Sequence, residues 1–341
     1  MSRKLIEQAS ESLRKGISEK AEAAQFEDDE YKAAAFDERH FRNIEDADPV
    51  KIAFVDGSNL EIVRSAHFSL QFVRLFYTLY DGKKRVAAEK AEFYAMIRAV
   101  NRDERIYFEV EVISNDAWLD ELNMKIYSFD ASMRQGYHRA DVSSVVHVVR
   151  RLGELLIAER ACQRLGKGGI LVLDGDLEAN YPREEEFLDR LYAYAKDVVI
   201  AGVSKTSTLL SSSGNSFTAL LNRRIGKWYY YPVADIEKQS HKAALLFARL
   251  HEKSSYVFKV EVYKEQAAEI GHVVSALASH ANDAVFIGYP YGLIEAHQFA
   301  KIPATEKDFH RIQLMAKLGR EWQDIERAVK STDAHEVLDR V

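Results

Sequence analysis

Two aspartates, Asp56 and Asp174, occupy positions where carboxylates often bind a metal ion. Each follows a short apolar run that favours a buried strand, and each precedes a glycine, in AFVDGS and LVLDGD. If these strands are neighbours and end at the aspartates, the carboxylates converge at the sheet edge where α/β folds bind ligands. Converging carboxylates suit a hard cation such as Mg²⁺ or Mn²⁺, which supports in-line phosphoryl transfer. Asp-Gly is also a frequent turn dipeptide, and on the pattern alone two ordinary turns are the more frequent explanation.

Three further residues suit such a site, and each also has an ordinary explanation. Glu154 follows Arg150 and Arg151 on a predicted helix, at the spacing of helix-surface ion pairs. His297 lies on a predicted helix after a Gly/Pro loop, where a structural or surface histidine is more frequent than a ligand. Lys205 comes directly after a predicted strand and is equally a solvent-exposed lysine. The residue types alone therefore favour the ordinary explanation for each of the three.

A basic and aromatic segment, NRRIGKWYYY at residues 222–231, is a candidate surface for nucleic acid. Arg223, Arg224 and Lys227 precede a run of aromatic residues. Basic side chains interleaved with aromatic rings support contacts to a phosphate backbone together with base stacking. A β-strand with an aromatic face explains the same residues equally well.

The elements that would position these residues follow from hydrophobic periodicity. Residues 68–80 form either a strand or a buried helix, and Asp81-Gly82 then suits a hairpin turn. Glu109 and Glu111 are expected on the solvated side of their strand. Strands are predicted at 51–56, 105–114, 170–173, 198–203, 255–263 and 285–287, and helices at 141–165, 184–196, 267–279 and 293–300.

Both ends of the chain look helical and charged. Residues 1–48 are expected to form a helical arm or hairpin without chemistry of its own, packed on the core or on a second subunit. One face of its first helix would be apolar, with Leu5, Ile6, Ala9, Leu13 and Ile17. The segment from residue 306 onward is expected to form a helical tail.

The composition is that of an ordinary globular protein. With 341 residues, 29% charged and 47% hydrophobic, the chain is long enough for a large core and about two domains. The single cysteine, Cys162, excludes an intramolecular disulfide and a cysteine-built zinc site, and fits a reducing, cytoplasmic location. The sequence contains neither an 18-residue apolar run nor a secretory signal, so we expect no membrane association. A formal net charge of −6 argues against coating nucleic acid by bulk charge, but allows a local basic groove.

Five segments in order resemble the NurA nuclease family. They are VDGS at 55–58, the helix that carries Glu154, LDGDL at 173–177, GVSKTS at 202–207 and GYPYGLIEAH at 288–297. Each is weak alone, but their shared order and spacing span about residues 50–302. The resemblance implies an RNase H-like nuclease domain at 49–305, a mixed central sheet flanked by helices, between the arm at 1–48 and the tail at 306–341.

The resemblance also implies an activity and partners. NurA nucleases depend on Mn²⁺, with Mg²⁺ as the alternative, and act on single- and double-stranded DNA as 5′-to-3′ exonucleases and single-strand endonucleases. They are homodimers that process DNA ends for recombination repair together with the hexameric ATPase HerA. The same role is therefore expected of this chain.

Carried over residue by residue, the resemblance assigns the site. Asp56, Glu154 and Asp174 correspond to the metal-binding carboxylates, and His297 to the final ligand or proton-transfer residue. Tyr289 corresponds to a tyrosine that helps to place the substrate. Lys205 is expected to stabilise phosphate charge in the transition state.

The remaining assignments are less direct. Asp176 would support the metal-binding residues, and Ser58 of the DGS motif would contact substrate together with Arg223, Arg224 and Lys227. Glu159 competes with Glu154 as the helix carboxylate.

Two other functions fit the same sequence. One is an RNase H-like nuclease for RNA or RNA–DNA hybrid, which cleavage of matched substrates would distinguish. The other is an adaptor of a motor ATPase that has lost catalysis, against which the acidic residues at 56, 154 and 174 argue. A nucleotide-binding ATPase is a poor alternative, because the chain has no G-x-x-x-x-G-K-[ST] segment.

Overall fold

The computed structural model describes residues 3–15, 22–46, 48–134 and 136–330. The chain forms two compact units, which we describe separately. The first unit contains Met1–Pro49, Asp174–Glu178 and Val199–Tyr291, and the second contains Val50–Leu173, Ala179–Val198 and Gly292–Val341. Within the described ranges, each helix is too short or too polar to cross a lipid bilayer.

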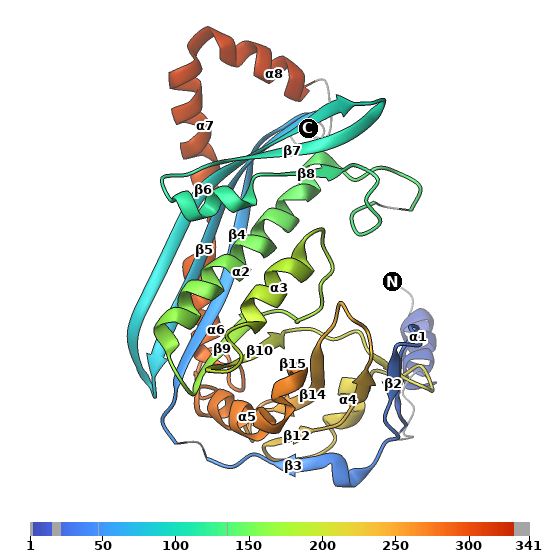
Figure 1. Cartoon of the computed structure of the whole chain (residues 1–341). Helices are drawn as coiled ribbons and strands as arrows, with labels where there is room; N and C mark the ends of the chain where they lie inside the picture. Colours follow the sequence, from blue (N-terminus) through green and yellow to red (C-terminus); the bar gives the residue numbers. More distant parts are fainter. Residues whose placement is uncertain (1–2, 16–21, 47, 135, 331–341) are drawn as a thin grey trace. The chain divides into compact units, whose positions relative to one another are not determined.

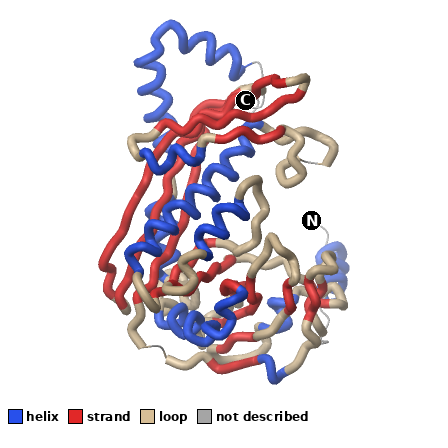
Figure 2. The backbone as a smooth tube through the Cα atoms, in the orientation of Figure 1, coloured by secondary structure: helices blue, strands red, loops and turns tan. Residues whose placement is uncertain are grey.

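The second unit is built on long antiparallel strands with one parallel neighbour (Figures 1 and 2). The strands lie in the order β9-β4-β5-β6-β7-β8, and β9 runs parallel to β4. Their bounds are β4 Lys51–Arg64, β5 Phe68–Asp81, β6 Lys84–Arg102, β7 Arg105–Ile113, β8 Met124–Tyr127 and β9 Gly169–Asp174. A five-stranded antiparallel meander, β4 to β8, followed by a helix and a parallel strand is thus the frame on which the second unit is built.

Helices pack against β4 and β5. α2 (Val145–Leu165) contacts both strands, α6 (Tyr291–Ala300) lies against Phe54, and α7 (Ala304–Leu318) contacts β4. α2 is buried over most of its length, because its valine, leucine and alanine residues supply apolar contacts on several faces. The other elements are the 3₁₀ turns η2 (Ala117–Leu122), η3 (Val142–Ser144) and η5 (Gly319–Glu321), and the helices α3 (Glu184–Tyr192) and α8 (Trp322–Lys330).

The first unit carries shorter strands, in the order β3-β12-β14-β15-β10. These are β3 Phe41–Asn43, β12 Trp228–Tyr230, β14 Ala243–Arg249, β15 Phe258–Tyr263 and β10 Val198–Ser204. Two small two-stranded sheets pair β1 (Ala24–Gln25) with β11 (Leu210–Ser211) and β2 (Tyr31–Ala33) with β13 (Ala234–Ile236). The unit also contains α1 (Arg3–Lys15), η1 (Glu38–His40), α4 (Phe217–Leu221), η4 (Lys264–Glu269) and α5 (Ile270–Ser279).

The expected RNase H-like α/β architecture, a mixed sheet flanked by helices, is confirmed. The predicted strands at 105–114, 170–173 and 198–203 form, as do the Asp81-Gly82 turn and the helix after Asp141, which accepts a hydrogen bond from the Ser143 N–H. Residues 68–80 are a strand, which resolves the alternative left open by the sequence. Glu109 and Glu111 pair with basic residues on the outer side of β7, as expected.

Three predictions were wrong. Among its described residues, the predicted arm is α-helical at Arg3–Lys15 alone, whereas the short strands β1, β2 and β3 between residues 24 and 43 pair with distant segments. Residues 285–287 form a loop. β4 does not end at Asp56 but continues to Arg64, paired with β5 throughout. Residues 16–21 of the predicted arm and 331–341 of the predicted tail lie outside the described residues.

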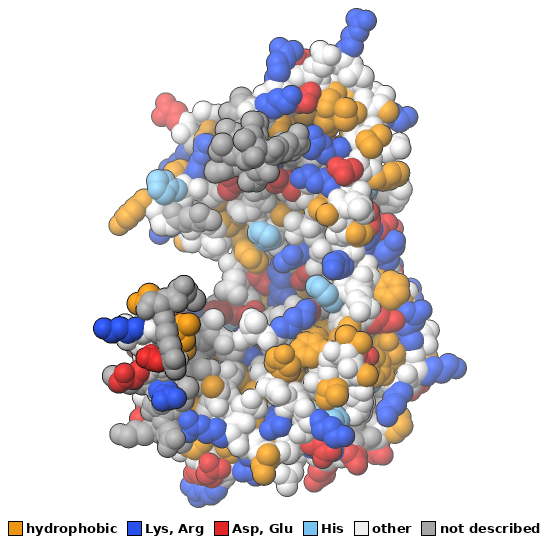
Figure 3. Space-filling model, turned by 180° about the vertical axis from the view of Figure 1, so that it is seen from behind, with side chains coloured by type: hydrophobic (Ala, Val, Ile, Leu, Met, Phe, Trp, Pro, Cys, Tyr) orange, Lys and Arg blue, Asp and Glu red, His pale blue; other side chains and the backbone are white. Residues whose placement is uncertain are grey.

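The surface matches the charge composition. Figure 3 shows basic and acidic side chains interspersed over the face that it draws. Such a mixture accords with a formal net charge of −6.

Candidate metal centre

Asp56 lies within β4 and points to the side of the strand that α6 covers. Alternate residues of a strand share a face, so Asp56 lies on the same side as Phe54, against which α6 packs. The Asp56 carboxylate is mostly buried, and its Oδ1 accepts the Gly57 N–H at 2.7 Å. β4 carries Asp56 inside a continuous strand, so the Asp-Gly turn expected there does not form.

Asp174 is brought to Asp56 by strand pairing. β9 runs parallel to β4 with Val55 opposite Leu173, so each aspartate is the next residue along neighbouring strands. Asp174 is the last residue of β9, as predicted, and forms an ion pair with Lys205. Lys205 follows β10 directly, where the sequence placed it.

His297 reaches the same place from α6. Its Nδ1 lies 2.9 Å from Asp56 Oδ2, and more than half of its side chain is exposed. Glu295 fixes this helix to β5, accepting hydrogen bonds from Thr78 at 2.7 Å and from Tyr80 at 2.6 Å. The helix residue predicted to complete the site thus has a defined position over Asp56.

Asp56, Asp174 and His297 form a group that fits a divalent cation. One ligand atom from each lies within 4.8 Å of the others. Two atoms that each lie about 2.0–2.4 Å from one ion can be at most about 4.8 Å apart, so the three residues can share an ion without rearrangement of the chain. Two carboxylates and an imidazole suit Mn²⁺ and Mg²⁺, and the donor set holds no thiolate.

Glu154 lies beside this group but is not one of the three. A Cβ added to Gly57 would lie 2.7 Å from Glu154 Oε1, so the glutamate occupies the space that a side chain at position 57 would take. Glu154 is only 8% exposed and pairs with Arg150 at 3.5 Å and Arg151 at 3.9 Å. The ion pairs of the ordinary explanation are thus present, and the role of Glu154 as a metal ligand stays a prediction.

Glu159, the competing helix carboxylate, pairs with Arg190 at 3.0 Å. Burial raises the pKa of Glu159 above its usual value. Arg190 lies on α3, which carries none of the three metal-site residues.

Tyr289 and Ser58 are the two predicted substrate-placing residues near these elements. Tyr289 is buried between the rings of Phe258 and Phe286, each with its centroid 5.1 Å away. Lys205 Nζ lies 5.8 Å from the centroid of the Tyr289 ring. The Tyr289 ring therefore packs beneath the Lys205 ammonium. Ser58 is half-buried on β4, two residues beyond Asp56.

The basic and aromatic segment at residues 222–231 buries most of its aromatic rings rather than presenting them for base stacking. Its aromatic residues Trp228, Tyr229 and Tyr230 form β12 and are buried, so these rings belong to the core. Arg224 lies 4.7 Å above the ring of Phe41 and pairs with Glu38, and Lys227 pairs with Asp46 at 2.7 Å. The strand alternative is confirmed for 228–230, and DNA contact by Arg223, Arg224 and Lys227 stays a prediction.

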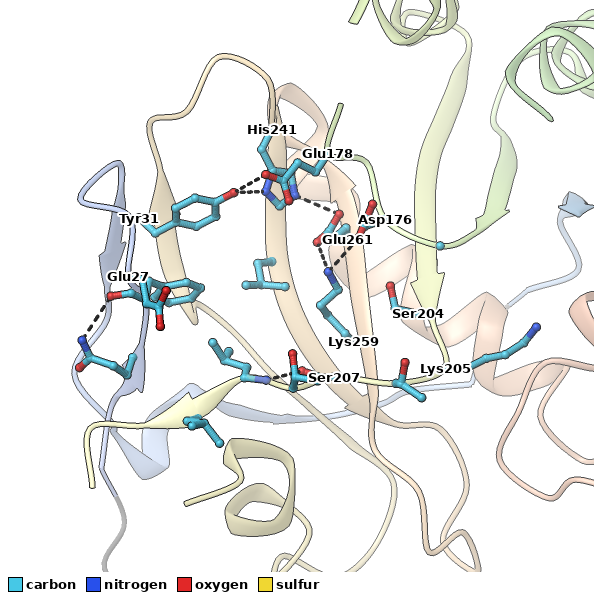
Figure 4. A pocket seen from close by; sticks show the side chains of 18 of the residues that line it. Glu27, Tyr31, Asp176, Glu178, Ser204, Lys205, Ser207, His241, Lys259 and Glu261 are labelled. Carbon is cyan, nitrogen blue, oxygen red and sulfur yellow. Dashed lines mark hydrogen bonds and ion pairs between the residues drawn. The ribbon is translucent and has the colours of Figure 1, made fainter. Parts of the chain in front are cut away.

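Sequence reasoning missed the residues that hold the loop after Asp174. A cavity of about 760 Å³ in the first unit is lined by Asp174, Lys205 and a buried set of charged residues that includes Glu261, Lys259 and His241 (Figure 4). Strand alternation in FKVEVY places Lys259 and Glu261 on a nominally polar face, which gives no signal of burial. The sequence indicates their pairing only through the spacing of Lys259 and Glu261, two opposite charges on the same face of one strand.

The comparisons with known proteins agree on one family. A family model described as the NurA domain matches residues 50–302. The crystal structure of the NurA nuclease from Sulfolobus solfataricus has a TM-score of 0.52 at 12% identity, covering 94% of this chain and 98% of that one. A second NurA structure has a TM-score of 0.50 at 11% identity, covering 86% and 93%, and a structure of NurA with manganese has a TM-score of 0.48 at 11% identity, covering 93% and 99%. No curated protein matches the sequence.

Proposed function

This chain belongs to the NurA family, and from that premise we propose that it is a metal-dependent deoxyribonuclease. The observation that carries the proposal is the convergence of Asp56, Asp174 and His297 within 4.8 Å. These residues come from two neighbouring strands and a helix that are far apart in the sequence. Their convergence gives the family's chemistry a specific location, within a nuclease domain that we place at residues 49–305.

Asp56, Asp174 and His297 are the residues proposed to hold Mn²⁺, with Mg²⁺ as the alternative. When bound, such an ion supplies positive charge to a scissile phosphate and lowers the pKa of water. Asp56 orients the imidazole of His297 through Nδ1, which leaves Nε2 as the second ring nitrogen for binding or proton transfer. Its exposure makes His297 the accessible proton-transfer group of the three.

Lys205 and Glu154 are proposed to complete the electrostatics of the site. Lys205 is the cation beside Asp174, and the buried Tyr289 ring limits the positions that it can take. An ammonium at this place would stabilise charge that develops on a phosphodiester. Glu154, held by two arginines next to Gly57, is proposed as a further carboxylate of the metal site. Asp176 is proposed to support the loop that carries Asp174.

The finer role rests on the family resemblance. We propose 5′-to-3′ exonuclease and single-strand endonuclease activity on DNA ends, a cytoplasmic homodimer, and work with a HerA-type hexameric ATPase in recombination repair. Arg223, Arg224, Lys227 and Ser58 are proposed to contact the strand. Charge removal at the three basic residues should then lower both DNA affinity and its dependence on salt.

The test is cleavage of a DNA strand labelled at its 5′ or 3′ end, with Mn²⁺, with Mg²⁺ and with chelator. Asp56→Asn and Asp174→Asn are compared with wild type and with Glu111→Gln, which removes an exposed carboxylate on β7. The proposal predicts metal-dependent cleavage that both asparagine variants lose and Glu111→Gln retains. Removing a metal-binding carboxylate is expected to reduce the rate by at least about 100-fold.

Three outcomes would contradict the proposal. Cleavage that survives Asp56→Asn would place the site elsewhere. Preferential cleavage of RNA or of RNA–DNA hybrid would identify the alternative nuclease. Absence of cleavage by wild type, even with the ATPase partner added, would favour an adaptor.

A further inference from the structure

The loop Asp174–Glu178, whose first residue is both the last residue of β9 and a proposed metal ligand, is held by a chain of charged residues (Figure 4). The Leu177 N–H donates to Glu261 Oε2 at 2.7 Å. Lys259 Nζ lies 3.5 Å from Asp176 Oδ2, and the Tyr31 hydroxyl donates to Glu178 at 3.2 Å. Three successive residues of the loop are therefore fixed from β15 and β2.

Glu261 is the centre of this arrangement. It is 1% exposed, and its carboxylate lies 3.0 Å from Lys259 Nζ and 3.1 Å from His241 Nε2. A buried carboxylate is costly unless it is paired and hydrogen-bonded, and here two cationic groups and a backbone N–H surround it. The pairing outweighs burial and lowers the pKa of Glu261 to about 2, so the group is ionised at neutral pH.

The neighbours of His241 favour its doubly protonated form. The Tyr31 hydroxyl donates to Glu178, which leaves its oxygen to accept from His241 Nδ1, 2.8 Å away. Nε2 lies 3.1 Å from the ionised Glu261, at ion-pair distance but without hydrogen-bond geometry, and the negative charge there favours a charged ring. Burial and the charge of Lys259 lower the pKa of His241, but Glu261 and Glu178 together outweigh them, so the pKa is raised above its usual value.

The loop has little room to adjust. The Gly175 N–H donates to the Val203 carbonyl at 3.0 Å, and a Cβ on Gly202 would lie 2.5 Å from the Gly175 carbonyl oxygen. The backbone next to Asp174 thus packs directly on β10. Only two residues, Gly175 and Asp176, lie between Asp174 and Leu177, so the chain has little length over which a shift of Leu177 could be absorbed before it reaches Asp174.

We propose that Glu261, together with imidazolium His241 and Lys259, is a positioning residue that sets the loop Asp174–Glu178 and so places the Asp174 carboxylate for metal binding. The inference rests on the proposed function in assigning Asp174 as a metal ligand. Glu261 acts through the Leu177 N–H and touches neither metal nor substrate. Buried ion clusters contribute little net stability relative to apolar residues, so a role in orientation accounts for the retention of this one.

The test compares Glu261→Gln with Glu89→Gln and measures Mn²⁺ binding directly, without DNA. Glutamine keeps an oxygen for the Leu177 N–H but has no charge to hold His241 and Lys259. Glu89 is a matched control, because it is also a mostly buried carboxylate paired with two cations, Arg160 at 2.6 Å and Arg164 at 3.2 Å, on β6. Electron paramagnetic resonance of free Mn²⁺ gives the dissociation constant of the full-length protein.

We expect Glu261→Gln to weaken Mn²⁺ binding about tenfold, the lower end of the effect of residues that orient metal ligands. Glu89→Gln should bind as wild type does. Both should remain folded by circular dichroism. Nitrogen-15 NMR of histidine-labelled protein at pH 7 should show a doubly protonated His241 in wild type and a neutral ring in Glu261→Gln.

Each contrary result overturns the inference. Equal Mn²⁺ affinity of wild type and Glu261→Gln, or equal loss in Glu89→Gln, would remove the positioning role, and a neutral His241 in wild type would remove the proton arrangement. Failure of the proposed function is recognised separately, as Mn²⁺ binding that depends on Asp174 without any DNA cleavage. Wild type that binds no Mn²⁺ would overturn the positioning role as well.

Discussion

Replacing Gly292 by alanine is expected to separate α6 from β4 and to move His297 away from Asp56. A Cβ at position 292 would lie 2.7 Å from Phe54 Cγ and closer still to two other carbons of the ring. Since carbon atoms pack at about 3.5–4.0 Å, relief requires a displacement of about 1 Å or more. Phe54 is fully buried, so its ring cannot turn aside without moving its neighbours. Overpacking of this kind costs about 1–3 kcal/mol of folding free energy.

The functional effect should be comparable in free energy to the effect on stability, since a 100-fold loss of rate corresponds to about 2.7 kcal/mol. His297 Nδ1 lies 2.9 Å from Asp56, and a misplacement of about 1 Å can lower the rate about 100-fold. Urea denaturation and Mn²⁺-dependent DNA cleavage are measured on the same preparations. The control is Gly271→Ala in α5, where the nearest atom to an added Cβ is the Tyr229 hydroxyl oxygen at 3.8 Å. Alanine there should leave cleavage unchanged and stabilise the protein by up to about 1 kcal/mol.

The refuting result is specific. If Gly292→Ala has the urea midpoint and the Mn²⁺ dependence of wild type, then α6 is not seated on Phe54 as described. Loss of stability without loss of cleavage would instead show that His297 does not depend on the seating of α6.

Three further predictions follow from single residues. Glu154→Gln should weaken Mn²⁺-dependent cleavage at least about tenfold, whereas Glu159→Gln should not, as measured by cleavage rates against Mn²⁺ concentration. Equal effects of the two would refute the choice of Glu154. Cys162 is 3% exposed and burial raises its pKa to about 12, so alkylation should require unfolding, and rapid labelling of native protein would contradict its burial. Glu261 has its pKa lowered from 4.5 to about 2, so it contributes stability above pH 4.5 that is lost as the pH falls through 2, and acid titrations of wild type and Glu261→Gln should converge over that range.

The fold was predictable where pairing is local. β7 was predicted from its alternating pattern and the Asp81-Gly82 turn from its residues, whereas β5 was left open between strand and helix and β6 was not predicted. The prediction of helix for residues 24–43 was wrong because β2 and β3 pair with strands about 185 to 205 residues further along the chain, for example Tyr31 with Ile236 and Asn43 with Trp228. Periodicity in a single sequence carries no information about such partners, and an alanine-rich, charged segment favours helix by default.

The prediction that β4 ends at Asp56 was wrong for a different reason. Asp-Gly-Ser-Asn has strong turn propensity, yet β4 passes through it and pairs with β5 to Arg64. Gly57 is explained by packing, since the missing side chain makes room for Glu154 and Leu75. Packing against Glu154 and Leu75 thus explains the glycine at position 57, which local propensity alone would assign to a turn.

The same parity of β4 limits how Glu154 can join the metal centre. Asp56 shares its face with Phe54 and α6, whereas Gly57 faces Glu154 of α2, so the two carboxylates approach β4 from opposite faces. β9 pairs with β4 only as far as Val55 and Leu173, and β4 then runs on past the end of β9. Asp56 and Glu154 could therefore hold one ion together only at this edge of β4, which is also the edge that carries Asp174. The sequence predicted that Asp56 and Asp174 lie together. The position of Glu154 beside β4 depends instead on the lack of a side chain at Gly57, and the periodicity of its helix carries no information about that contact.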